Sequence, residues 1–119
     1  MDPKQIASSF ITHYYSIFDS NRANLAQIYQ PQSILSWEGK EFQGVQKIVE
    51  HLTELPFSQV QRKSSHDVQT TFQGGLIIFE FGTLSIDNSP PMKYSRVFHL
   101  ANNNNQFLLL NDFFRLNIE

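Results

Sequence analysis

Gly75-Leu-Ile-Ile-Phe-Glu-Phe-Gly82 is the stretch that decides the fold, and it is the first of three strongly β-forming runs in the second half of the chain. The other two are Tyr94-Ser-Arg-Val-Phe-His-Leu100 and Phe107-Leu-Leu-Leu-Asn-Asp-Phe-Phe-Arg-Leu116. Aromatic and aliphatic residues dominate all three, which predicts strands. A more polar run, Val60 to Phe72, is predicted to add another strand.

Turn-forming residues separate these runs. They are Gly74-Gly75, Asp87-Asn-Ser-Pro-Pro91 and Asn102-Asn-Asn-Asn105. Gly, Pro, Asn and Asp reverse the chain readily, and the three lengths suit hairpins between antiparallel strands. The second half is therefore expected to form an antiparallel sheet.

The first half has the helical period instead. Asp2 followed by Pro3 is typical of a helix start, because Asp accepts bonds from free N–H groups and Pro is tolerated in the first turn. The helix is expected to end near Phe18, and the spacing of its apolar residues predicts one buried face. These residues are Ile6, Phe10, Tyr14 and Ile17.

Two shorter helices are predicted after it. Leu25, Ile28 and Tyr29 suggest one that runs to about Gln30, before Pro31. The other opens after Gly44 and closes before Pro56, with apolar residues at helical spacing, namely Val45, Ile48, Val49 and Leu52. Helices followed by strands indicate the α+β class, with the helices on one side of a curved antiparallel sheet.

The bulk composition limits the classes of function. The 119 residues suit a single domain, 1–119. The net charge is −2 and the longest basic run is Arg62-Lys63, so nucleic-acid binding is not expected.

The chain has no cysteine, which excludes disulfides and thiolate chemistry. No apolar run reaches membrane-spanning length and the amino terminus lacks a signal sequence, so neither membrane insertion nor export is expected.

Several separated blocks, in order and over almost the full length, resemble the nuclear transport factor 2 family. They are Ser9-Phe-Ile-Thr-His-Tyr-Tyr-Ser-Ile-Phe-Asp19, Trp37-Glu-Gly39 with Phe42-Gln-Gly44, Ile48-Val-Glu50 leading to Leu55-Pro-Phe57, and Asn111-Asp-Phe-Phe-Arg-Leu116. The resemblance implies a cone, in which a strongly bent sheet packs against three helices and encloses a hydrophobic cavity open at one end. It also implies a homodimer paired through the sheets.

The function that this resemblance implies is transport of the GDP form of Ran into the nucleus. In the family the cavity accepts an aromatic side chain of Ran-GDP, and acidic residues at its rim pair with basic residues beside that side chain. The rim positions correspond to Glu38 and Asp87, while Ser89 stands where members often carry a second acid. The cavity wall corresponds to Trp37, Leu55, Phe57, Leu84, Ile86, Met92 and Phe114.

The second partners implied by the resemblance are the Phe-Gly repeats of nucleoporins. Asp19 matches an acidic position near the repeat-binding groove, and Pro3 stands where the vertebrate pattern has a tryptophan. Such a carrier is expected in cytoplasm and nucleus, concentrated at the nuclear pore. It requires no cofactor.

Two alternatives share the same cone. One is a small-molecule enzyme of the isomerase or dehydratase type, with its acid–base groups among His13, Tyr14, Tyr94, His99 and Asp112. Asp112 is expected to pair with Arg115 or backbone donors rather than to act as a base. The other alternative is a dimerising module of an RNA-export or stress-granule scaffold. A metal site is not expected, because the histidines 13, 51, 66 and 99 are scattered.

Overall fold

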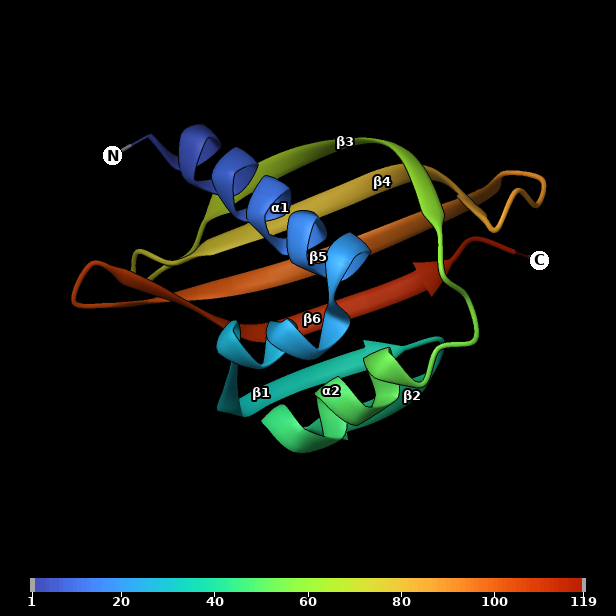
Figure 1. Cartoon of the computed structure of the whole chain (residues 1–119). Coiled ribbons are helices and arrows are strands. Elements are labelled where there is room, and N and C mark those ends of the chain that lie inside the picture. The colour runs from blue at the N-terminus through green and yellow to red at the C-terminus, as the bar shows by residue number, and fades with distance from the viewer. Residues whose placement is uncertain (1, 119) are drawn as a thin grey trace.

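The computed structural model describes residues 2–118, and within them six strands form one curved sheet in the order β2-β1-β6-β5-β4-β3 (Figure 1). The strands are β1 (Tyr29–Trp37), β2 (Lys40–Gln43), β3 (Val60–Thr70), β4 (Leu76–Ile86), β5 (Met92–Asn103) and β6 (Gln106–Leu116). Strands β3 to β6 follow one another as antiparallel hairpins, as the turn residues predicted. The fold is α+β, with the helices on the concave side of the sheet (Figure 1).

The helices are α1 (Pro3–Ser20), the 3-10 helix η1 (Arg22–Gln27) and α2 (Val45–Thr53). The predicted helix start is confirmed, because the side chain of Asp2 accepts a 3.0 Å bond from the backbone N–H of Lys4. Helix α1 crosses strands β3 to β5, and α2 lies over β1 and β2 (Figure 1). Between these two helices one end of the sheet is left uncovered.

The predicted second helix is wrong in its type and its end. It is a 3-10 helix that stops at Gln27, and Tyr29 and Gln30 already belong to β1. Pro31 lies inside β1, where the pairing with β6 shifts register between Tyr29 and Ile34. A proline is tolerated at such an irregularity because its missing N–H interrupts no regular ladder. Strand β1 pairs in parallel with β6, so one pair in an otherwise antiparallel sheet is parallel.

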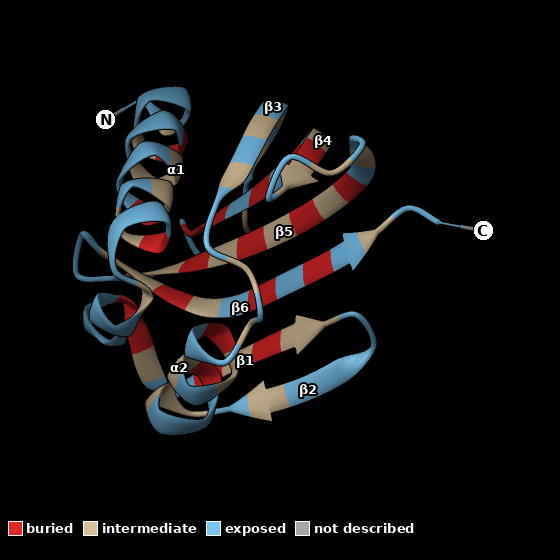
Figure 2. Ribbon diagram, turned by 45° about the vertical axis from the view of Figure 1, so that its right-hand side comes forward, coloured by how far each residue is buried: buried red, intermediate tan, exposed pale blue. Residues whose placement is uncertain are grey.

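The two faces of the sheet differ in burial. Alternate residues of β4, β5 and β6 are buried against the helices (Figure 2). The convex face instead exposes large apolar side chains: Ile77, Phe79, Phe81 and Phe113. An apolar face of this kind marks a surface that another molecule covers.

The bend of β3 toward the helices depends on Gly82 in β4. A Cβ atom added at Gly82 would lie 2.0 Å from the carbonyl oxygen of Lys63, which is closer than any real contact. Only a residue without a side chain lets the two backbones approach this closely. The resulting bend carries the start of β3 over the uncovered end of the sheet.

Candidate functional site

A cavity of about 90 Å³ opens at the uncovered end of the cone, between β3, β4, β6 and the end of α1. Its walls are almost entirely apolar. The lining side chains are Tyr15, Phe18, Trp37, Glu38, Phe57, Val60, Arg62, Leu84, Ile86, Tyr94, Arg96, Phe114 and Leu116. Small-molecule and side-chain pockets commonly combine such an apolar lining with a few placed polar groups.

The central wall consists of two stacked rings. Trp37 and Phe114 are direct partners in the parallel pairing of β1 with β6. Their ring centroids lie 4.2 Å apart at an interplanar angle of 18°. Phe114 also stacks on Tyr94, at 5.9 Å between centroids. The parallel pairing of β1 with β6 thus places two stacked aromatic rings in the lining of the cavity.

Below the wall lies a buried ion pair. The Nη2 of Arg96 donates to Asp112 Oδ2 at 2.7 Å and its Nε donates to Oδ1 at 2.8 Å. The Tyr29 hydroxyl also donates to Asp112 Oδ2, at 2.6 Å. A further Arg96 bond, 2.8 Å long, reaches the Tyr14 hydroxyl. Burial opposes the charge of Arg96, but the neighbouring Asp112 carboxylate overrides it and raises the pKa of Arg96 above its ordinary value.

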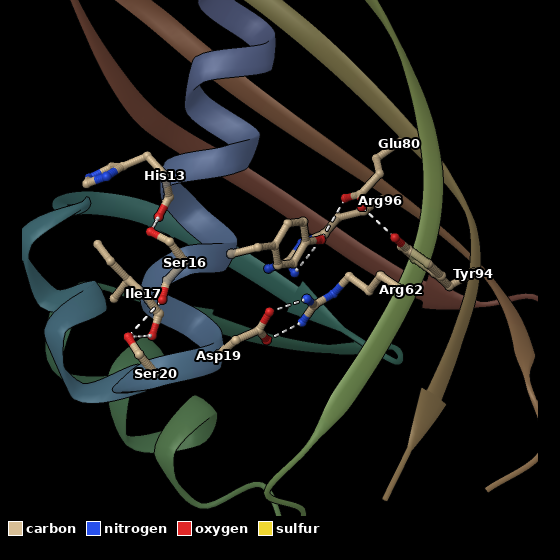
Figure 3. A network of polar contacts seen from close by, with 10 residues as sticks. His13, Ser16, Ile17, Asp19, Ser20, Arg62, Glu80, Tyr94 and Arg96 are labelled. Atoms are coloured by element: carbon tan, nitrogen blue, oxygen red, sulfur yellow. Dashed lines mark hydrogen bonds and ion pairs between the residues drawn. The ribbon is translucent and has the colours of Figure 1, made fainter. Parts of the chain in front are cut away.

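Glu80 forms the other half of this polar floor. It is fully buried and accepts a hydrogen bond from Tyr15 at 2.6 Å. A second bond, from Tyr94, is 2.5 Å long (Figure 3). Burial raises the pKa of Tyr15 and of Tyr94 well above the ordinary value, and the pKa of Tyr14 to about 12. These phenols therefore stay protonated at neutral pH and act as donors.

Two acids lie around the mouth, and both sit on left-handed backbone. Glu38 has φ 51° and accepts a hydrogen bond from the backbone N–H of Leu116. Asp87 has φ 48°, and its Oδ1 accepts bonds from the N–H groups of Ser58, at 3.2 Å, and Gln59, at 2.9 Å. These bonds, that from Gln59 first, lower the pKa of Asp87 below its ordinary value. Each carboxylate thus also holds a nearby backbone segment in place, at residue 116 for Glu38 and at residues 58–59 for Asp87.

An ion pair closes one side of the cavity. Both terminal nitrogens of Arg62 donate to Asp19, at 2.8 and 3.0 Å, and join β3 to the end of α1 (Figure 3). The guanidinium lies over the Tyr15 ring, with its central carbon 3.8 Å from the ring centroid. Arg62 lines the cavity, so this ion pair holds part of its lining in place between β3 and α1.

The structure brings most of the residues anticipated from the sequence to this one place. Trp37, Glu38, Phe57, Leu84, Ile86 and Phe114 line the cavity. Leu55 instead packs against the main core, and Met92 packs behind the cavity against Leu84, Tyr94 and Phe114. Asp87 stands at the turn beside Ile86, and Asp19 is the partner of Arg62.

Several lining residues were missed from the sequence. Tyr15, Phe18, Val60, Arg62, Arg96 and Leu116 line the cavity but were not named for it, and Tyr94 was named only as a possible acid–base group. The spacing of Tyr15 from Phe18 along α1 carries part of this signal. The inward position of Arg96, two residues from the buried Tyr94 and Phe98, carries another part.

The candidate acid–base groups are bonded to other side chains of the protein or lie outside the lining of the cavity. Both oxygens of Asp112 accept bonds, and its partner is Arg96 rather than the expected Arg115, which is exposed. Tyr14 is fully buried beneath the floor, and His13 is exposed on α1. His99 bonds to Asn111 at 2.9 Å.

The described residues, 2–118, contain no cluster of three or more His, Cys, Asp or Glu side chains that could hold a metal ion. Among the helices described, none is both long and apolar enough to cross a membrane.

Comparisons with known proteins agree with this geometry. Residues 6–116 match the model of the nuclear transport factor 2 (NTF2) domain. The chain is 52% identical to nuclear transport factor 2 of Dictyostelium discoideum over 98% of its length and 95% of that relative. It is 44% identical to nuclear transport factor 2 of Schizosaccharomyces pombe, over 98% and 97% of the two chains. The solved structure of nuclear transport factor 2 from Cryptosporidium parvum superposes with a TM-score of 0.89 at 41% identity, covering 97% of this chain and 94% of that one. The chain therefore belongs to the nuclear transport factor 2 family.

Proposed function

We propose that this chain is a nucleocytoplasmic carrier that binds the GDP form of Ran through the cavity at the open end of the cone. The observation that carries the proposal is an apolar cavity, walled by Trp37 and Phe114, with Glu38 in its lining and Asp87 next to the lining residue Ile86. A guest aromatic ring would bury roughly 150–250 Å² there, which is enough to anchor a complex. Ran-GDP as the guest follows from the family resemblance.

The floor of the cavity favours a binding role over catalysis. A general base needs a free lone pair within reach of a substrate proton. Glu80 and Asp112 are instead buried, are bonded to Tyr and Arg side chains, and are not among the side chains that line the cavity, so neither carboxylate lies within reach of a substrate there. As a member of the nuclear transport factor 2 family, the chain is a transport factor and not an enzyme.

The rim acids have capacity left for a guest. Oε1 of Glu38 and Oδ1 of Asp87 bind the chain's own backbone. The second oxygen of each carboxylate makes no hydrogen bond within residues 2–118. These oxygens can pair with basic residues beside a bound ring. Such exposed pairs mainly set approach rate and orientation, while the ring supplies the affinity.

Titration calorimetry of the chain against Ran-GDP and Ran-GTP tests the proposal. Binding to Ran-GDP and not to Ran-GTP is expected. Glu38→Gln keeps an oxygen for the Leu116 N–H while removing the charge, so the Kd is expected to rise about twofold to fivefold without loss of stability. Glu50→Gln, on the exposed face of α2, is the matched control. Absent or equal binding to the two nucleotide states would end the carrier proposal.

Two copies of the chain are proposed to pair through the convex face of the sheet. Phe113 is 56% exposed there and Phe79 is 41% exposed, which would leave a contiguous apolar surface in water. Light scattering at micromolar concentration is expected to give the mass of a dimer. A monomer under those conditions would contradict the pairing.

Phe-Gly repeats of nucleoporins are the proposed second partners, with Asp19 as a contributing residue. The Asp19 side chain remains 42% exposed although it pairs with Arg62, so it stays accessible to a repeat. Many weak contacts of this kind permit fast passage. The proposed location, in cytoplasm and nucleus with enrichment at the nuclear pore, is checked by imaging the labelled chain in permeabilised cells. A uniform distribution without a nuclear rim would oppose it.

A further inference from the structure

The turn between β4 and β5, residues 87–91, stands at the mouth of the cavity. Ile86, which ends β4, lines the cavity, and Met92, which begins β5, packs against the cluster of lining residues Leu84, Tyr94 and Phe114. A group attached to this turn therefore changes the surface that a guest meets.

Ser89 is the central residue of that turn. Its N–H donates to the Ile86 carbonyl at 2.8 Å, and its Oγ accepts from the Ile86 N–H at 3.1 Å. The flanking Asn88 and Pro90 are exposed. Ser89, itself partly exposed, is thus bonded to a lining residue within a short turn whose other residues are exposed.

The two residues after Ser89 favour binding of this segment by an enzyme that takes its substrate as extended chain. Pro90 and Pro91 have no N–H groups, so they donate no backbone hydrogen bond to the rest of the fold. A proline also biases the residue before it toward extended backbone. Ser-Pro in extended form is the dipeptide that proline-directed protein kinases modify.

We propose that Ser89 is a phosphorylation site for a proline-directed serine/threonine kinase, and that the phosphate increases the negative charge of the cavity mouth. The Ser89 Oγ attacks the γ-phosphorus of ATP, and an Oγ–P bond forms as the bond to the β–γ bridging oxygen breaks. ADP leaves with the electron pair, and the hydroxyl proton passes to the base of the kinase. The turn gains a charge of about −1.5 to −2 at neutral pH.

The consequence for binding rests on the proposed function. The mouth now carries two acids, Glu38 and Asp87, and the nearby cations Arg22 and Arg62 offset part of their field. Arg62 is already paired with Asp19. A dianion at Ser89 would make the mouth strongly negative and favour a guest that carries basic residues beside its aromatic ring.

The first arm of the test concerns the modification alone. The full-length chain is incubated with ATP and a proline-directed kinase, and the phosphate is located by mass spectrometry. One phosphate at Ser89 is expected in the wild type and none in Ser89→Ala. Pro90→Ala, which keeps the serine, is expected to lose most of the modification. An unmodified wild type, or a Pro90→Ala variant modified as readily, would overturn the site.

The second arm measures the effect on binding. Phosphoserine is installed at position 89 during synthesis, and the Kd for Ran-GDP is compared with that of the unmodified chain. Binding about threefold to tenfold tighter at low salt is expected, with most of the gain lost at about 500 mM salt. Unchanged or weaker binding would overturn the proposed effect. If the unmodified chain binds no Ran-GDP, the carrier function and this effect fail, whereas the kinase arm still decides the site.

Discussion

The floor and the rim of the cavity both carry charge, but they hold it in opposite ways. At the floor, Arg96 and Asp112 are 1% and 0% exposed in their side chains, and each oxygen of Asp112 has a donor. At the rim, Glu38 and Asp87 are exposed on left-handed turns, and within residues 2–118 they bind only backbone N–H groups and one serine hydroxyl. The difference teaches that the inner charges fix the shape of the cavity, whereas the outer ones remain available to another molecule.

The largest effect is expected from breaking the floor. Asp112→Ala leaves the Arg96 guanidinium buried without a counter-charge and should lower the free energy of unfolding by about 3–5 kcal/mol. Urea unfolding followed by circular dichroism measures this. Asp67→Ala, at an exposed position of β3, is the control and should change stability by less than about 0.5 kcal/mol. Equal stabilities of the two variants would refute a structural role for the ion pair.

The next largest effect is expected from changing the aromatic wall of the cavity, which tests its contribution to binding apart from that of the acidic rim. Trp37→Ala removes the ring that stacks on Phe114, and hot-spot aromatics of this kind contribute about 2 kcal/mol or more to binding. The Kd for Ran-GDP is therefore expected to rise by about thirtyfold or more in calorimetry. Phe72→Ala removes a ring that is 100% exposed at the other end of β3 and should leave the Kd unchanged. A similar loss in both variants would mean that the cavity is not the binding site.

A smaller effect tests the rim with two identical substitutions. Asn88 and Asn105 both have φ 68°, and they lie on turns at opposite ends of β5. Asn88→Asp adds one negative charge at the mouth and should raise the association rate with Ran-GDP about twofold at low salt. Asn105→Asp adds the same charge far from the mouth and should not. Stopped-flow fluorescence distinguishes them, and equal rates would show that rim charge does not steer the guest.

The smallest effect concerns His51, behind the Trp37 wall. Its ring stacks on Phe42 at 4.2 Å and meets Trp37 edge-on at 5.5 Å. Burial lowers the pKa of His51 from its ordinary value of 6.5, Lys40 adds to the lowering and Glu54 opposes it. As the pH falls through 6.5, the unfolded chain therefore binds the proton first and the free energy of unfolding decreases, until the folded pKa is passed.

His51→Gln removes this contribution. Between about pH 7.5 and about pH 5.5, the urea midpoint of the variant should fall less than that of the wild type. His13, which is exposed on α1, supplies the matched variant His13→Gln, whose midpoint should follow the wild type. If His51→Gln shows the full wild-type loss, His51 is not held in its neutral form by the fold.

The sequence predicted the parts of the fold that depend on local period. Helix α1 and strands β3 to β6 follow from apolar spacing and turn residues, all of which act over a few neighbours. Strand β1 was missed because Pro31 and the polar residues around it resemble a loop, and its place is fixed by pairing with β6, about 80 residues later.

The candidate site was predicted unevenly for a similar reason. Trp37, Glu38 and Phe114 came from motifs that resemble a family, whereas Arg96 and Glu80 were not anticipated at the floor. A charged residue in a strand is normally exposed. The alternation along β4 and β5 indicates that Glu80 and Arg96 point inward, but the partners that stabilise their burial lie on other elements, such as Tyr15 on α1, and the local pattern does not identify them.

The close approach of β3 to β4 at Gly82 has a consequence for how a guest is received. This curvature comes from two main chains in direct contact, with no movable side chain between them. The cavity therefore has its shape before a guest binds. The conformational entropy of ordering the cavity is lost during folding, so binding of an aromatic ring does not require that loss again.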